Sequence, residues 1–86
     1  MSQKFNVVVE VSLRDGIADP EGLTIERALP ALGFNSVGGV RVGKSLRFDL
    51  EASNESEARQ QVEAMCERFL ANPVIEDARI SIIGVT

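Results

Sequence analysis

The chain lacks histidine, tryptophan and tyrosine and has one cysteine. Without histidine, neither a Ser-His nor a Cys-His catalytic pair can form, and the commonest general base near neutral pH is missing. A lone Cys66 cannot form an internal disulfide, and the chain opens without an apolar signal segment. Both observations favour a reduced, cytoplasmic setting. These absences weigh against an enzyme acting on its own.

Basic residues are also scarce, because 9 Lys and Arg face 13 Asp and Glu, for a net charge of −4. Such a charge repels phosphate backbones, and four Phe residues offer little surface on which bases could stack. Nucleic acid is therefore not expected as a partner. No apolar run reaches the roughly 20 residues that a membrane-spanning helix needs, so no membrane role is expected either.

Motifs for phosphate or metal binding are missing too. Gly38, Gly39 and Gly43 do not lead into a helix start, so they do not make a phosphate-binding loop. Metal ligands would have to come from acidic pairs such as Glu76 and Asp77, which are more often solvated loop charges. We predict no metal site and no cofactor in this chain.

The local patterns predict alternating strands and helices over one domain, residues 1–86. Apolar residues at every second position of 5–13 predict a strand, and Asp19 with Pro20 predicts a helix start. Gly33 is placed to cap that helix in a left-handed conformation, and Pro30 is expected to tighten its last turn.

Residues 37–51 resemble a β-hairpin, because Val40, Val42 and three later apolar residues all fall at even positions. A shared core face then requires an odd-length turn at residues 43–45, in which Gly43 supplies the backbone freedom. This register sets Arg41 opposite Arg47. Like charges across a strand pair repel unless an anion or acidic partner lies between them, although Asp49 could instead neutralise Arg41 within the chain.

A second helix is predicted to begin at Asn54 and to end before Pro73. Its apolar stripe comprises Ala58, Val62, Met65, Cys66, Phe69 and Leu70. Cys66 on this stripe is expected to be a buried structural thiol. A last strand over residues 78–85 places Ile80 and Ile82 on one face and Ile83 and Val85 on the other.

The resulting order, β-α-β-β-α-β, predicts an α+β, ferredoxin-like fold: an antiparallel sheet with two helices on one face. Apolar residues on both faces of the last strand leave a face or an edge of the sheet that is a liability unless it is covered.

Several segments together resemble the PurS family, the small subunit of phosphoribosylformylglycinamidine (FGAM) synthase. They are residues 19–22 with Asp19, Pro20 and Gly22, residues 32–34 with Gly33 and Phe34, residues 40–44 with Gly43, and residues 72–77. The run from Met65 to Asp77 is the most distinctive, and the resemblance covers nearly the whole chain.

This resemblance implies a non-catalytic subunit for purine biosynthesis. It implies self-association as a homodimer or tetramer, with the sheet extended across the homodimer, which the apolar faces of the last strand fit. It also implies assembly with a glutaminase subunit (PurQ) and an ATP- and Mg-using synthetase subunit (PurL). The complex converts formylglycinamide ribonucleotide, glutamine and ATP to FGAM, and the small subunit is expected to hold the two active sites in register for ammonia transfer. Interface candidates are Arg41, Lys44, Arg47, Asn72, Pro73, Glu76 and Asp77.

Two alternatives remain open at this point. A ligand-sensing regulatory module would have the same helix-on-sheet topology. A small acyl-phosphate hydrolase would need an arginine in a phosphate-binding loop, for which Arg14 with Gly16 is the only candidate.

Overall fold

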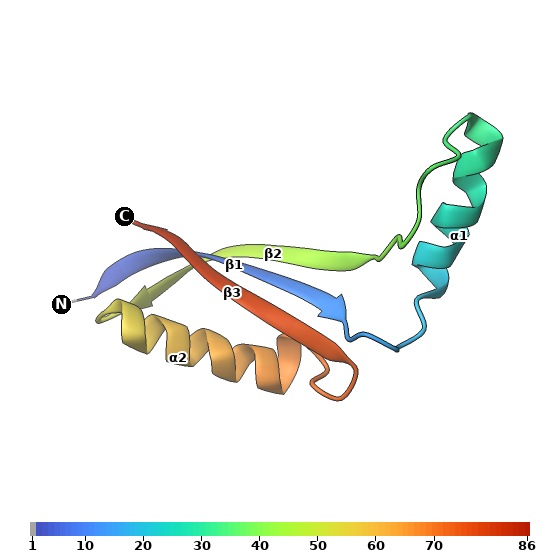
Figure 1. The fold of residues 1–86 in the computed structure, drawn as a ribbon. Helices are drawn as coiled ribbons and strands as arrows, with labels where there is room; N and C mark the ends of the chain where they lie inside the picture. The colour runs from blue at the N-terminus through green and yellow to red at the C-terminus, as the bar shows by residue number, and fades with distance from the viewer. Residues whose placement is uncertain (1) are drawn as a thin grey trace.

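The computed structural model describes residues 2–86 (Figure 1). Its elements in chain order are β1 (Gln3–Leu13), α1 (Pro20–Ala28), the 3₁₀ turn η1 (Leu29–Leu32), β2 (Gly43–Ala52), α2 (Glu55–Met65), the π turn η2 (Cys66–Leu70) and β3 (Glu76–Val85). The strands form one sheet in the order β2-β1-β3, and β1 is antiparallel to both neighbours. The predicted α+β class with an antiparallel sheet is confirmed.

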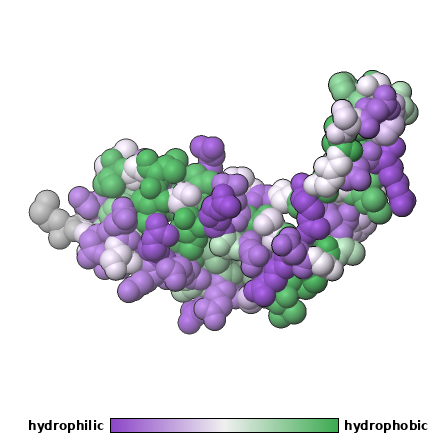
Figure 2. All heavy atoms as spheres, viewed as in Figure 1, coloured by the Kyte–Doolittle hydropathy of each residue, from purple (hydrophilic) through white to green (hydrophobic). Residues whose placement is uncertain are grey.

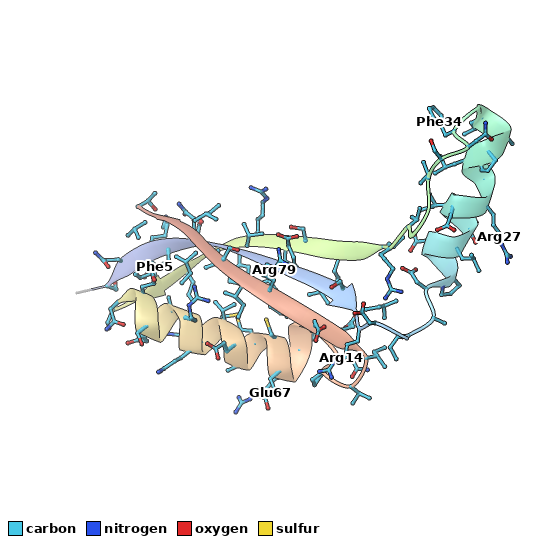
Figure 3. All side chains as sticks on the ribbon, in the orientation of Figure 1. Phe5, Arg14, Arg27, Phe34, Glu67 and Arg79 are labelled. Carbon is cyan, nitrogen blue, oxygen red and sulfur yellow. The ribbon has the colours of Figure 1, made fainter. Side chains whose placement is uncertain are left out.

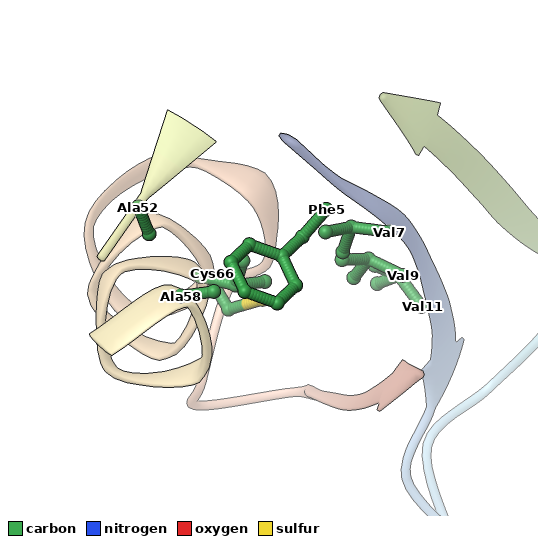
Figure 4. Close-up of a cluster of buried hydrophobic side chains, with 8 residues drawn as sticks. Phe5, Val7, Val9, Val11, Ala52, Ala58 and Cys66 are labelled. Atoms are coloured by element: carbon green, nitrogen blue, oxygen red, sulfur yellow. The ribbon is translucent and has the colours of Figure 1, made fainter. Parts of the chain in front are cut away.

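The hydrophobic core lies between β1 and α2. Phe5, Val7, Val9 and Val11 point from alternate positions of the central strand and are at most 2% exposed, which confirms the predicted alternation. They are joined in the core cluster by Ala52, Ala58, Val62 and Cys66 (Figure 4). Cys66 is a buried free thiol, as the stripe predicted.

Only α2 covers the sheet, and the expectation that both helices share one face is wrong. In Figure 1, α1 stands beyond the end of the sheet. We call α1, η1 and the returning segment, residues 20–42, the arm. The arm stretches the Cα trace to 56 × 27 × 14 Å with a radius of gyration of 16.8 Å. A compact chain of this length would have a radius of gyration of about 12 Å.

The predicted hairpin at residues 37–51 does not form either. β2 is one continuous strand whose partner is β1, from Gly43 opposite Ser12 to Ala52 opposite Gln3. Residues 40–42 precede it as an irregular segment. Gly43 makes no turn: a Cβ there would lie 2.6 Å from the Val11 carbonyl oxygen, so glycine permits the close approach of the two strands.

The ends of α1 agree with the prediction. Asp19 is the N-cap and accepts a hydrogen bond from the Gly22 N–H at 2.9 Å. Pro30 lies in the tightened 3₁₀ turn, and Gly33 ends it in the left-handed region at φ 95°. The Gly33 N–H donates to the Pro30 oxygen, and the Phe34 N–H reaches back five residues to a carbonyl of the same turn.

The predicted α2 stripe is confirmed at Ala58, Val62, Cys66 and Leu70 and is wrong at Phe69. Asn54 caps the helix by accepting from the Glu57 N–H at 2.9 Å. The helix then widens into a π turn, in which the Ala71 N–H donates to the Cys66 oxygen. One extra residue in the turn rotates the stripe, so Phe69 is 87% exposed.

A bulge also changes the end of β3. Ile80 and Ile82 pack against the core, as predicted. The register then shifts between Asn6 and Val7, and Val85 lies opposite Phe5. Directly opposed residues share a sheet face, so Val85 lies on the core face and its predicted placement on the other face is wrong.

Candidate subunit interface

The arm is joined to the sheet by polar contacts around Arg41. The Arg41 guanidinium donates hydrogen bonds to three backbone carbonyls at the β1–α1 connection. Its Nη2 donates to the carbonyl oxygens of Leu13 and Arg14, each at 3.1 Å, and its Nη1 donates to that of Ile17 at 3.4 Å. Its Nε lies 3.9 Å from Asp19 Oδ2. The structure therefore gives Arg41 contacts within its own chain.

Asp19 completes this junction from the other side. One carboxylate oxygen caps α1 through Gly22, and the other accepts from the Val42 N–H at 2.8 Å. The Asp19 side chain is only 7% exposed. Hydrogen bonds from the backbone N–H groups of Val42 and Gly22, with a smaller contribution from the Arg41 charge, hold the pKa of this carboxyl below its usual value.

Glu26 adds a third contact about two turns beyond Asp19 along α1. Its Oε1 accepts from the Val40 N–H at 2.9 Å. Carboxylates thus bind the backbone N–H groups of residues 40 and 42, which the predicted hairpin had assigned to a partner strand. This is the physical reason that the hairpin does not form.

Lys44 and Arg47 lie apart from this junction, on β2. Lys44 lies opposite Val11, and Arg47 lies opposite Val8. The predicted opposition of Arg41 and Arg47 is wrong, and so is the proximity of Asp49, which lies opposite Asn6. The three basic candidates therefore do not form one charged cluster. Lys44 and Arg47 remain exposed candidates for contact with a partner.

The candidates at residues 72–77 form a tight turn between α2 and β3. The Asn72 side chain accepts from the Val74 N–H at 3.1 Å, and the Asn72 N–H donates to Glu76 Oε1 at 2.7 Å. Asp77 pairs with Arg14 at 3.3 Å. Pro73 is exposed at the tip of this turn. Asn72, Glu76 and Asp77 hold the turn in shape, and Pro73 and Val74 form its outer surface.

Arg14 connects the two groups of residues, a role that no sequence pattern predicted. Its carbonyl accepts from Arg41, its N–H donates to Ile75, and its side chain pairs with Asp77 (Figure 3 labels Arg14). The phosphate-binding alternative needed this guanidinium to be directed into a loop with Gly16. Its Nε is instead directed at Asp77 and the Glu76 carbonyl.

Exposed apolar side chains of the arm are the main feature that the sequence reading missed. They are Leu23, Ile25, Leu32, Phe34 and Val37, with exposed fractions of 41–70%. Figure 2 shows apolar atoms gathered at the tip of the arm, and Figure 3 places Phe34 there. The helical spacing of Ile25 and Leu32 predicts an apolar stripe that faces the core, whereas α1 stands beyond the end of the sheet (Figure 1). Large exposed apolar surfaces mark sites of protein association.

The described part of the chain offers little for catalysis. No three Cys, Asp or Glu residues within residues 2–86 gather as metal ligands. Burial, with the nearby Glu63 charge, raises the pKa of the Cys66 thiol, which disfavours the reactive thiolate. Over the same residues, the helices are too short and too polar to cross a bilayer.

Comparison with known proteins agrees with these features. Residues 6–84 match the family model PurS, phosphoribosylformylglycinamidine (FGAM) synthase. The FGAM synthase subunit PurS of Methanocaldococcus jannaschii is 42% identical over 78 residues, which cover 91% of this chain and 94% of that protein. The crystal structure of the Thermotoga maritima purS subunit matches with a TM-score of 0.88 at 34% identity, covering 96% of this chain and 95% of the other. A chain of the Thermotoga maritima PurLQS structure matches with a TM-score of 0.86 at 35% identity, covering 93% and 98%.

Proposed function

This chain belongs to the PurS family and is a subunit of FGAM synthase in purine biosynthesis, and from that premise we propose that it acts as a non-catalytic bridging subunit. In this role it joins a glutaminase (PurQ) and an ATP- and Mg-using synthetase (PurL), and supports ammonia transfer between them. Residues 1–86 act as one domain, in the cytoplasm. The observation that carries the proposal is the apolar arm, which has no core of its own.

The first partner of this surface is a second copy of the chain. The arm carries five large apolar side chains that the fold leaves exposed, and its extended shape keeps them away from the sheet. β2 and β3 are the outer strands of the sheet in residues 2–86, so each also has one edge without a strand beside it. A symmetric pair of chains can cover both kinds of surface at once, which supports the sheet extension expected from the sequence.

Reconstitution tests the bridging role. FGAM formation is measured with the synthetase and the glutaminase, with and without this chain, using either glutamine or ammonium as the nitrogen donor. We expect glutamine-dependent synthesis to fall at least tenfold without the chain, whereas ammonium-dependent synthesis by the synthetase persists, because free ammonium needs no transfer between subunits. Equal glutamine-dependent rates in both mixtures, or failure of the three chains to co-purify, would refute the proposal.

A further inference from the structure

The junction of arm and sheet is formed by side chains bonded to backbone groups. Arg41 reaches three carbonyls of the β1–α1 connection, and Asp19 and Glu26 accept from the N–H groups of Val42 and Val40. We call this set, Asp19, Glu26 and Arg41, the clasp. From it we propose that Asp19 and Arg41 are positioning residues, which fix the direction in which the arm leaves the sheet and thereby present its apolar side chains to a second copy of this chain.

The clasp holds a part of the chain that has little hydrophobic packing against the sheet. No residue of the arm in the described structure belongs to the hydrophobic core, and Gly22 is the one arm residue that is buried. An arm held by one covalent connection at each end could swing about both ends. The clasp ties residues 13–17 and the start of α1 to residues 40–42 through Arg41 and Asp19, and Glu26, near the end of α1, binds Val40 within the arm. Directed hydrogen bonds restrict angle as well as distance, so they define one orientation.

Gly22 shows that the two chain segments at the junction are in close contact. A Cβ at this position would lie 2.5 Å from the Val40 carbonyl oxygen and 2.9 Å from Asp19 Oδ2. The first turn of α1 therefore rests directly on the returning segment. This close approach brings the Val42 N–H within reach of the same carboxylate that caps the helix, so a single aspartate both starts α1 and attaches it to the segment that leads into β2.

An apolar groove beside the clasp continues the surface of the arm. It has a volume of about 550 Å³, and its apolar lining includes Ile17, Ala18, Leu23 and Val40. Leu23 belongs to both the groove and the exposed apolar set of the arm. A second copy that covers the arm would then also contact the groove, whose lining includes the clasp residues Asp19, Glu26 and Arg41.

This inference rests on the proposed self-association, and the test separates the two. Spin labels are attached at Ser36→Cys on the arm and Ser45→Cys on β2, in a Cys66→Ala background, and the distance distribution is measured by pulsed electron resonance. Labelled chains are diluted with a tenfold excess of unlabelled chains, so that the distance measured lies within one chain. Sedimentation equilibrium gives the dissociation constant of the dimer for the same variants without labels.

Two mild variants open the clasp. Asp19→Asn keeps one oxygen to cap Gly22 but loses the charge and the oxygen that binds Val42, and Arg41→Met removes the three carbonyl contacts. Matched controls are Asp15→Asn, in the same connection, and Arg27→Met, on the exposed surface of α1 (Figure 3). Glu26→Gln, which retains the acceptor for Val40, is a conservative control within the clasp.

We expect a single narrow distance distribution in the parent chain and in all three controls. In Asp19→Asn and Arg41→Met it should at least double in width, and the dimer dissociation constant should rise at least tenfold, with the circular dichroism of the sheet unchanged. Distributions as narrow as that of the parent in both variants would overturn the inference. If the parent chain itself stays monomeric, the self-association proposal fails, and the distance distributions still decide whether the clasp fixes the arm.

Discussion

Truncation of Phe34 tests whether the arm is the surface of self-association. Phe34 is 58% exposed at the tip of the arm. A phenylalanine side chain buries about 150–250 Å² when fully covered, so a partner can cover roughly 110 Å² more of Phe34. At about 25 cal/mol per Å², this area is worth about 2–3 kcal/mol in each copy. Phe34→Ala removes most of it.

A two-fold interface contains the residue twice, so the loss doubles. Complete coverage of both side chains predicts a loss of about 4 kcal/mol, and half coverage predicts about 2 kcal/mol. Each 1.4 kcal/mol is a factor of ten, so the dissociation constant of the dimer should rise by about 30-fold to 1,000-fold. Sedimentation equilibrium over a range of protein concentrations measures this constant directly.

Phe69→Ala is the matched control, because it removes the same atoms from another exposed site. Phe69 is 87% exposed on the π turn, away from the arm. Neither truncation should change the free energy of unfolding by more than about 0.5 kcal/mol once the contribution of association is subtracted. A dissociation constant that changes less than threefold in Phe34→Ala would refute the reasoning, and an equal loss in Phe69→Ala would place the interface elsewhere.

Three further outcomes follow from the core and the junction. Phe5→Ala, at a side chain that is 1% exposed, should lower the free energy of unfolding by about 3–5 kcal/mol in urea titrations at fixed protein concentration, and a loss below 1 kcal/mol would contradict the assigned core. Gly22→Ala should lower the melting temperature because its Cβ meets the Val40 oxygen at 2.5 Å, whereas Gly38→Ala, with open space around it, should leave the melting temperature unchanged or slightly raised. The pKa of Asp19 is lowered in the folded chain, so its ionised form stabilises the fold above the usual value of 3.8, and this stabilisation is lost as the pH falls through the lower folded value. Acid titration followed by circular dichroism should therefore show a smaller loss of stability below about pH 4 in Asp19→Asn than in the parent, and identical acid profiles would count against this assignment.

The sequence correctly predicted the parts of the fold that depend on interactions between neighbouring residues. The alternation in β1, the cap at Asp19, the left-handed Gly33 and the cap at Asn54 each depend on a few neighbouring residues, and the structure confirms all four. Cys66 was also placed correctly, because it lies on the regular part of the α2 stripe.

The apolar periodicity led to a wrong prediction at residues 37–51, where two different structures are compatible with the same pattern. Val40 and Val42 have the same parity as the apolar residues of β2, so a hairpin and a loop followed by one strand look alike in the sequence. The choice was made by Asp19 and Glu26, which are 23 and 14 residues away from the N–H groups that they bind. The prediction for Phe69 is wrong for a related reason. The π turn adds one residue to a helical turn, and residue composition does not reveal such an insertion.

The apolar side chains of α1 do not pack against the sheet of their own chain, contrary to what their helical spacing predicts. Ile25, Ala28, Leu29 and Leu32 recur as in a helix that packs on its own sheet, yet Ile25 and Leu32 are 41% and 70% exposed. An amphipathic helix is stabilised mainly by burial of its apolar face, so α1 requires a cover from outside the chain. The clasp explains how such a helix can still be held in one place: hydrogen bonds fix its direction and leave the whole apolar face free. On the proposed self-association, the amphipathic pattern serves a contact between chains, and the polar residues at the junction keep the apolar face from packing on its own sheet.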